Sequence, residues 1–385
     1  MPEPLITTVI PTYRRPAMLR RAIRSVLNQT FRDFRVCVYD NASGDETAAV
    51  VEEFRSKDSR VEYFCRTGNI GAHDNFVDGA NRVETPFFSF LSDDDIMLPN
   101  LYESTLAGFR RYPEAALSTL ATVRMRPNGM IMHVWLRQWP EGLIVPPNGV
   151  LSILRHGDPG LQSLLIRKDV WEKFGGFDEL TEPCADVDFQ LRIAACLPIV
   201  VSRKIGAIGI IHPDSTTVST EFKAVWPGLR RLADKFNQDT TLPTDVRQRA
   251  AAMLALGMKR SLLTQGVARY ISRGKWEEAE WAADTLVQES GGASAARIIR
   301  GATAICRRLP STRFLVRALF VLRASVRTML NLDVQWRYRM HSRFLKTCTV
   351  AASSENLTSA ALSASENDKI ARRVHHSPSA GKLLS

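Results

Sequence analysis

Apolar runs and amphipathic stretches alternate along the N-terminal quarter of the chain. β-Branched and aromatic runs bounded by turn residues predict strands, and apolar residues at a spacing of three and four predict helices. The predicted strands are 5–10, 34–39, 61–65 and 87–91. The predicted helices are 19–27, 43–55 and 74–82. Strands that alternate with helices at this spacing are typical of a parallel sheet covered by helices on both faces.

Local signals refine some of these boundaries. Ser43 and Glu46 have the spacing of a capping box, which predicts that the second helix begins at Ser43. Strands are predicted at 116–125 and 129–136, and a pair of short strands at 199–201 and 205–211. A helix is expected to begin near Asp186.

Beyond residue 220 the pattern is helical, with predicted breaks at Pro227 and Pro243. The expected domains are an α/β domain over 1–220, whose halves meet near 98/99, and a basic α-helical region over 221–350. Few large apolar residues follow, so 351–385 is predicted to be a disordered tail.

Composition places the chain among soluble globular proteins, with 45% hydrophobic and 24% charged residues. Its six cysteines show no CxxC spacing, which favours reduced thiols and a cytoplasmic location over a disulfide framework or a zinc site. No secretory signal is visible, and no apolar run is long enough to cross a bilayer.

Positive charge is concentrated near the C-terminus. The net charge of the chain is +11, and residues 301–350 contain ten Arg or Lys residues against one acid, Asp333. Aromatic and aliphatic residues are interleaved with these arginines, which fits a helix lying on an anionic membrane at its inner face. An ordinary solvated basic face fits equally well. Binding to nucleic acid is not expected.

Candidate chemistry begins where the strand at 87–91 ends, in the acidic run Asp93, Asp94 and Asp95. Ligands of open α/β sheets bind at the carboxyl ends of the strands. Adjacent carboxylates repel one another unless a cation compensates them, and Mg²⁺ or Mn²⁺ prefers oxygen ligands. Asp93 and Asp95 point the same way in an extended segment, so we expect them to reach the metal and its nucleotide, with Asp94 between them. A solvated acidic turn that caps the next helix is the alternative.

The other predicted strands also end in polar residues. Pro11, Thr12 and Tyr13 follow the first strand, Asp40 the second, and Asn69 the third. An acid after the second strand of a nucleotide-binding sheet commonly bonds a ribose hydroxyl or a base, although a turn residue explains Asp40 equally well. No GxGxxG or GxxxxGK[ST] motif is present to hold phosphate, which leaves that task to a metal.

Several motifs in order resemble family 2 glycosyltransferases. They are Thr8-Val-Ile-Pro-Thr-Tyr-Arg-Arg-Pro, Leu27-Asn-Gln-Thr-Phe, Val38-Tyr-Asp-Asn-Ala-Ser-Gly-Asp-Glu-Thr, Asn69-Ile-Gly and Leu91-Ser-Asp-Asp-Asp-Ile-Met-Leu-Pro. The resemblance covers about 5–215 and implies a GT-A fold with a mostly parallel sheet, followed here by the helical region. It also implies that 11–13 and Asp40 contact the nucleoside. Asp93 and Asp95 would form the DxD element that holds Mg²⁺ or Mn²⁺ and the diphosphate.

Gly175-Gly-Phe-Asp, followed by Ala185-Asp-Val-Asp, resembles the acceptor-side motif of the same family. The family usually has Glu-Asp, with the Asp as catalytic base; here Ala185 replaces the Glu. Asp186 is therefore the expected base, and Asp188 is an alternative. A carboxylate in the first turn of a helix is kept ionised by free backbone amides, but a plain N-cap explains it too.

Two further features have open interpretations. His212 ends the last predicted strand, where related enzymes close a loop over the diphosphate, so it is a candidate phosphate or metal contact; a lone histidine is more often structural. Trp135 and Trp139 could line an acceptor pocket, although such residues more often belong to the core.

Together these features predict an inverting, metal-dependent glycosyltransferase. The predicted donor is a nucleoside diphosphate sugar, of the UDP or dTDP type, and the predicted acceptor is a hydroxyl of a glycan or glycolipid in cell-surface polysaccharide synthesis. The alternatives are a non-catalytic, membrane-associated binding module with the same fold and a sugar nucleotidyltransferase.

Overall fold

A computed structural model of the chain describes residues 4–238, 242–290, 293–309, 311–312, 314–318, 322, 338–339 and 341. The strands are β1 (Ile6–Thr12), β2 (Phe34–Asp40), β3 (Val61–Cys65), β4 (Phe87–Phe90), β5 (Ile96–Met97), β6 (Leu117–Met125), β7 (Ile131–Val134), β8 (Gly142–Ile144), β9 (Leu164–Arg167) and β10 (Ile199–Ile210). The helices of the sheet domain are α1 (Pro16–Leu27), α2 (Thr47–Arg55), α3 (Ala72–Asn81), α4 (Leu101–Arg111), α5 (Asn148–His156), α6 (Lys168–Phe174) and α7 (Ala185–Cys196), with short helices η1 (Leu161–Ser163) and η2 (Glu179–Thr181). Then come α8 (Thr216–Ser219), α9 (Phe222–Gln238), α10 (Thr244–Ser261), the π-helix η3 (Leu262–Ala268), α11 (Arg269–Arg273), α12 (Trp276–Ser290) and α13 (Ala293–Arg308).

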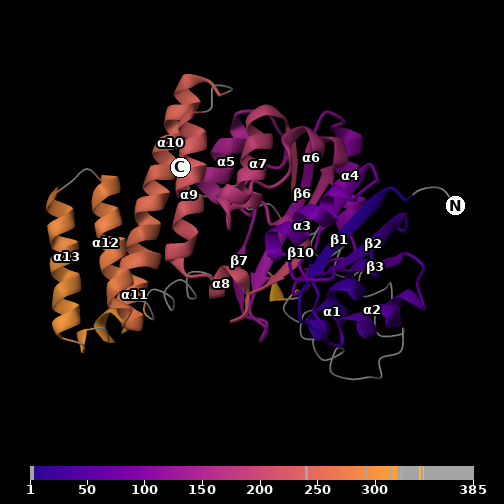
Figure 1. Cartoon of the computed structure of the whole chain (residues 1–385). Helices are drawn as coiled ribbons and strands as arrows, with labels where there is room; N and C mark the ends of the chain where they lie inside the picture. Colours follow the sequence, from indigo (N-terminus) through magenta and orange to yellow (C-terminus); the bar gives the residue numbers. More distant parts are fainter. Residues whose placement is uncertain are drawn as a thin grey trace.

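One twisted sheet forms the centre of the molecule (Figure 1). Its main strand order is β3-β2-β1-β4-β9-β6-β10-β5, with β7 paired to β6 and β8 to β10. The β3-β2-β1-β4 half is parallel, whereas β9 is antiparallel to both of its neighbours. The α/β class is therefore confirmed, with a mixed sheet in which β5, β7, β8 and β9 pair antiparallel to their neighbours.

Helices cover both faces of this sheet. One buried cluster joins α1, α2 and α4 to side chains such as Ile10 and Val38, and the other joins α3, α5, α6 and α7 to their sequence neighbours Val9 and Tyr39. Successive side chains of a strand point to opposite faces, so adjacent residues enter different clusters. This is why the strands read as continuous apolar runs.

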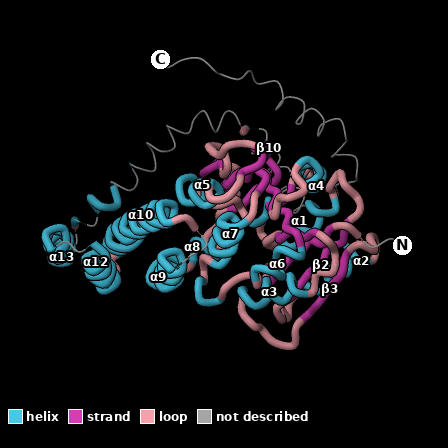
Figure 2. Tube along the Cα trace, turned by 90° about the horizontal axis from the view of Figure 1, so that it is seen from above, coloured by secondary structure: helices cyan, strands magenta, loops and turns pink. Residues whose placement is uncertain are grey.

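The helices after α8 pack beside the sheet domain and have a core of their own (Figures 1 and 2). Phe222, Trp226, Leu262 and Tyr270 belong to this second core. In the part of the chain that the structure describes, no helix is long and apolar enough to span a membrane. Most of the basic segment 301–350, and all of the tail predicted at 351–385, lie outside the described residues.

Three local predictions were wrong. Helix α2 begins at Thr47, because Ser43 accepts a hydrogen bond from the Arg14 amide and donates its own amide to Asp40 instead of capping the helix. The two short strands predicted after residue 198 are one strand, β10, which continues its pairing with β6 across a bulge between Ser202 and Ile205.

Pro227 does not break the helix that contains it. It lies inside α9, and the buried side chains of Trp226, Leu232 and Phe236 anchor that helix on both sides of the proline. Tertiary packing therefore outweighs the local cost of a proline in a helix.

Candidate active site

The carboxyl ends of β1, β2 and β4 meet at one edge of the sheet. The register places Thr12 of β1 opposite Asp40 of β2. The Thr12 hydroxyl donates a 2.8 Å hydrogen bond to Asp93, which follows β4. Residues predicted separately from three strand ends are thus in contact or adjacent.

The acidic run is buried rather than solvated. Asp93, Asp94 and Asp95 are only 4%, 8% and 5% exposed. The Arg15 guanidinium lies 3.2 Å from Asp93 and 3.5 Å from Asp94. His212 Nε2 lies 2.9 Å from Asp94 Oδ2. The alternative of a solvated acidic turn is therefore wrong.

Asp95 is held differently from its neighbours. Its carboxylate accepts a 2.8 Å hydrogen bond from the Ile210 amide at the end of β10. Burial, and then the charge of Asp94, raise the pKa of Asp95 to about 7. Burial also raises the pKa of Asp93 to about 6, although Arg15 opposes the shift. These acids carry more negative charge than their surroundings compensate.

This donor set fits a hard divalent cation in its chemistry. Asp93 and Asp95 offer carboxylate oxygens, and a cation would stabilise the ionised forms that burial disfavours. Among the described residues, no three His, Cys, Asp or Glu side chains converge so as to hold a metal by themselves. A cation here would therefore need further oxygen ligands from a bound diphosphate or water. His212 contacts Asp94 and is not placed with Asp93 and Asp95 as a third ligand.

Asp40 is buried, and each of its carboxylate oxygens already accepts a hydrogen bond within the protein. Its carboxylate accepts hydrogen bonds from the Ser43 amide at 3.0 Å and from the Tyr63 hydroxyl at 2.6 Å. Tyr13 is 38% exposed, and the Arg14 guanidinium lies over its ring at 5.1 Å. A planar, accessible ring beside a buried carboxylate can stack on one face of a nucleobase.

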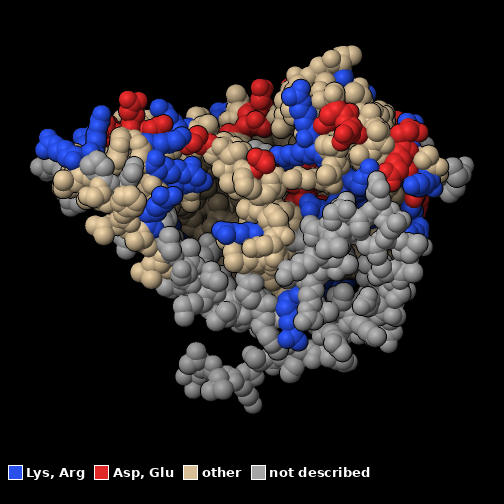
Figure 3. All heavy atoms as spheres, turned by 90° about the horizontal axis from the view of Figure 1, so that it is seen from below, with Lys and Arg blue, Asp and Glu red and all other residues tan. Residues whose placement is uncertain are grey.

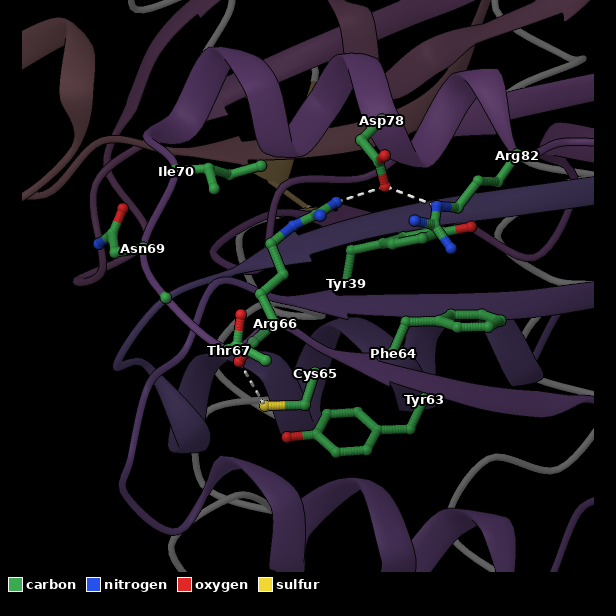
Figure 4. Close-up of a pocket in the computed structure, with 11 residues that line it drawn as sticks. Tyr39, Tyr63, Phe64, Cys65, Arg66, Thr67, Asn69, Ile70, Asp78 and Arg82 are labelled. Atoms are coloured by element: carbon green, nitrogen blue, oxygen red, sulfur yellow. Dashed lines mark hydrogen bonds and ion pairs between the residues drawn. The ribbon is translucent and has the colours of Figure 1, made fainter.

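A cavity of about 560 Å³ opens between β3 and α3, on the Asp40 side of the sheet (Figure 4). Arg66 and Arg82 both contact Asp78 across it. Asn69 lies at one end, where its side chain accepts bonds from Asn41 at 2.9 Å and from the Gly71 amide at 2.8 Å. In this structure Asn69 therefore shapes the loop after β3.

On the acceptor side, Asp186 and Asp188 have different surroundings. Asp188 is 1% exposed and forms ion pairs of 2.7 Å with both Arg192 and Lys235. Asp186 lies in the first turn of α7, half-buried, and its carboxylate accepts a 2.9 Å hydrogen bond from the Val187 amide. Burial raises the pKa of Asp186, which makes it a stronger base than an ordinary aspartate.

A further carboxyl group, Asp158, was not predicted. Burial and then the charge of Asp186 raise the pKa of Asp158 to about 7. The positive charge of Arg124 lowers the pKa of both Asp158 and Asp95, so this arginine stands between the acceptor side and the acidic run. The only hint in the sequence is an acid in a Gly-Asp-Pro-Gly turn, which is too common to single out.

The predicted tryptophans have separate roles. Trp139 is 2% exposed and belongs to the core, which agrees with the interpretation of this residue as part of the core. Trp135 is half-buried, and the Arg124 guanidinium lies over its ring at 5.0 Å. Both tryptophans lie beside the segment that carries Asp158, because Trp139 bonds to Gly157 and Trp135 packs against Gly160.

Comparison with known proteins identifies the family. The family model described as Glycosyl transferase family 2 matches residues 7–172. Residues 7–172 form a glycosyl transferase family 2 domain. A GalNAc(5)-diNAcBac-PP-undecaprenol beta-1,3-glucosyltransferase of Campylobacter jejuni is 34% identical over 96 residues, 25% of this chain and 31% of that protein. Chondroitin synthase of Escherichia coli is 25% identical over 244 residues, 60% of this chain and 34% of that protein. The chain thus spans about a third of the length of these relatives.

Solved structures of glycosyltransferases share the fold. S. aureus TarS in complex with UDP-GlcNAc superimposes with a TM-score of 0.59 at 16% identity, covering 87% of this chain and 92% of that one. The mannosyltransferase PcManGT of Pyrobaculum calidifontis, in complex with GDP-Man and Mn²⁺, gives a TM-score of 0.50 at 12% identity, covering 86% and 88%. Both matches extend beyond the sheet domain, so the GT-A fold and the helices that follow it are shared.

Proposed function

We propose that this family 2 member is an inverting glycosyltransferase that moves a sugar from a nucleoside diphosphate sugar to an acceptor hydroxyl of a glycan or glycolipid. The observation that carries the proposal is the buried acidic run at the same sheet edge as Asp40. The charge of Arg124 lowers the pKa of both Asp95 in this run and Asp158, the neighbour of Asp186, which links the two sides of the site. The activities of its relatives, in glycan and glycolipid synthesis, support this class of reaction.

In this proposal the donor lies over the edge of β1, β2 and β4. Tyr13 and Asp40 hold the nucleoside, and Asp93 and Asp95 hold Mg²⁺ or Mn²⁺ with the diphosphate. When bound, the cation supplies Lewis-acid stabilisation of the diphosphate leaving group. Arg15, already in contact with Asp93 and Asp94, offers a second positive charge toward the same group.

Asp186 is the proposed base. It accepts the proton of the acceptor hydroxyl while the acceptor oxygen bonds to the anomeric carbon from the face opposite the diphosphate. The bond from that carbon to the diphosphate oxygen breaks, and its electron pair leaves with the diphosphate. A single displacement of this kind inverts the configuration.

A membrane surface is the proposed location of a lipid-linked acceptor. Five large apolar side chains after α12 are each more than half exposed: Ile305, Leu309, Phe314, Leu315 and Leu322. Arg307, Arg308 and Arg317 are interleaved with them. Figure 3 shows Lys and Arg side chains gathered over the end of the molecule that carries these helices. Apolar and cationic groups together favour an anionic leaflet.

The test is nucleoside diphosphate release from a panel of UDP-, dTDP- and GDP-sugars, with Mn²⁺ or with EDTA, in the presence of glycan and glycolipid acceptors. We expect steady release with one donor, dependent on acceptor and lost in EDTA. Pyrophosphate release from UTP and a sugar phosphate would identify a nucleotidyltransferase instead. Binding of a nucleotide sugar without any turnover would identify a non-catalytic binding module instead.

A further inference from the structure

The antiparallel packing of α5 against α7 brings Asp158 beside Asp186. The two helices lie side by side in both views (Figures 1 and 2). Gly149, at the start of α5, meets Ala194, near the end of α7, so closely that a Cβ on Gly149 would lie 2.9 Å from the Ala194 Cβ. The end of α5 therefore lies at the beginning of α7, and segment 157–160 carries Asp158 to this place.

Two tryptophans fix segment 157–160. Trp139 donates its indole N–H to the Gly157 carbonyl oxygen at 3.2 Å. Gly160 packs flat on Trp135, where a Cβ would lie 2.6 Å from the ring. Gly157 has a φ of 89°, which favours glycine and ends α5 abruptly. The position of Asp158 is thus set by packing, and the residue is half-buried.

The charges around the two carboxyl groups leave them to act on each other. Burial, and then the charge of Asp186, raise the pKa of Asp158, and burial, followed by the charges of both carboxylates, raises the pKa of the Cys184 thiol at the N-cap of α7 to about 12. Arg124 of β6 acts in the opposite sense on Asp158. The neighbouring carboxylate of Asp188 is already neutralised by its own ion pairs. The other titratable groups on elements packed against α7 are Arg155 and His156 of α5, Lys168, Asp169, Glu172 and Lys173 of α6, and Glu179 of η2 with its N-cap Asp178.

We propose that Asp158 and Asp186 form a carboxyl pair that shares the proton taken from the acceptor hydroxyl. Asp186 is the catalytic residue, and Asp158 is a positioning residue that strengthens it. Two adjacent carboxylates resist being ionised together, so the doubly ionised pair accepts a proton more readily than a lone aspartate. The proton leaves the acceptor oxygen as that oxygen bonds to the anomeric carbon, and the diphosphate departs with the electron pair. This inference rests on the proposed glycosyl transfer.

The test is the pH profile of kcat at saturating donor and acceptor, for the wild type and Asp158→Asn. The wild type should lose activity as the pH falls through a value well above the ordinary pKa of an aspartate. Asp158→Asn removes one negative charge, so the acid limb should move to lower pH by about one unit, and kcat on the plateau should fall roughly threefold to tenfold because the base is weaker. A structural role alone would lower kcat without moving the limb.

Two controls separate the possible failures. Asp169→Asn removes an exposed carboxylate from α6, which also packs against α7, and should leave the acid limb in place. Asp186→Asn retaining full activity would overturn the proposed base itself. An inactive Asp186→Asn together with an unmoved limb in Asp158→Asn would overturn only the carboxyl pair.

The wild-type profile tests the pair without any variant. An acid limb at the ordinary pKa of an aspartate would overturn the pair even if Asp158→Asn fails to fold.

Discussion

Asp186 and Asp188 lie two positions apart on α7, yet they can do different chemistry. Asp188 is buried between Arg192 and Lys235, whereas Asp186 lies close enough for its charge to raise the pKa of Asp158. Each carboxylate oxygen of Asp188 is already paired with a cation, which leaves Asp188 poorly placed to receive an acceptor hydroxyl. A carboxylate beside a second carboxylate is a better proton acceptor than a lone carboxylate.

Asp186→Asn should lower kcat by roughly 10²- to 10⁴-fold while donor binding is retained. The amide keeps the size of the side chain but cannot accept the proton. Titration calorimetry of nucleotide binding and steady-state turnover on the same protein check the two halves of this prediction. A similar loss of nucleotide affinity would show that Asp186 serves the donor rather than the acceptor.

Asp188→Asn should instead destabilise the fold. Arg192 and Lys235 would lose their shared partner, which lies at the contact between α7 and α9. Since both cations are a quarter exposed and regain some hydration, we expect a loss of about 2 kcal/mol in the free energy of unfolding. Urea denaturation measures it. An unchanged midpoint would mean that these ion pairs contribute nothing to stability.

The positions of residues that directly follow strands could be predicted from the sequence better than the positions of residues that depend on helix packing. Asp93 to Asp95 and Asp40 could be predicted to lie together, because parallel strands deliver their ends to one edge of the sheet. The resemblance to the family indicated Asp186. Asp158 was missed because its place depends on how α5 crosses α7, which no local pattern encodes. Arg15, too, gained its role only when the chain brought it to Asp93.

Among the elements, α9 joins the helical region to the sheet domain through a very close contact. A Cβ on Gly228 would lie 2.1 Å from the Glu182 carbonyl oxygen, which is backbone and cannot rotate away. Gly257, on α10, has nothing within 4 Å of the same position. The two glycines form a matched pair, one packed and one open.

Gly228→Ala should therefore destabilise the protein by about 1–3 kcal/mol, because α9 must move off the segment before α7. Gly257→Ala should stabilise it by about 0.5–1 kcal/mol, because alanine favours an exposed helix. Thermal unfolding of both variants measures these changes. Equal effects of the two substitutions would contradict the close contact.

The boundaries of helices and strands were predicted well where hydrophobic periodicity determines them. They were predicted poorly where a side chain has more than one possible hydrogen-bond partner. The alternation of strands and helices up to β4 is confirmed by the structure. Ser43 has the spacing of a cap but bonds to the loop of Arg14 and Asp40. The short antiparallel strand β9 escaped prediction because its sequence reads equally well as the start of a helix.

For the whole molecule, the exposed apolar and basic residues after α12 should determine membrane attachment. Leu315→Ser combined with Leu322→Ser should reduce binding to phosphatidylglycerol vesicles roughly tenfold, because each removes buried apolar area at the interface. Vesicle flotation measures binding. Leu256→Ser is the control, since Leu256 is 70% exposed on α10, outside this basic surface.

Binding should also fall with added salt and be absent from neutral phosphatidylcholine vesicles, because Arg side chains contribute through their charge. Equal binding of the double variant and the wild type would contradict a role of this surface. The sequence located its charge, but only the structure showed which of its apolar side chains face outward.

The account depends most on where the nucleotide binds. A crystal structure of the protein soaked with UDP and Mn²⁺ tests this directly. The account predicts the diphosphate beside Asp93 and Asp95, with the base toward Asp40 and Tyr13. A nucleotide seated elsewhere, with these carboxylates uninvolved, would contradict it.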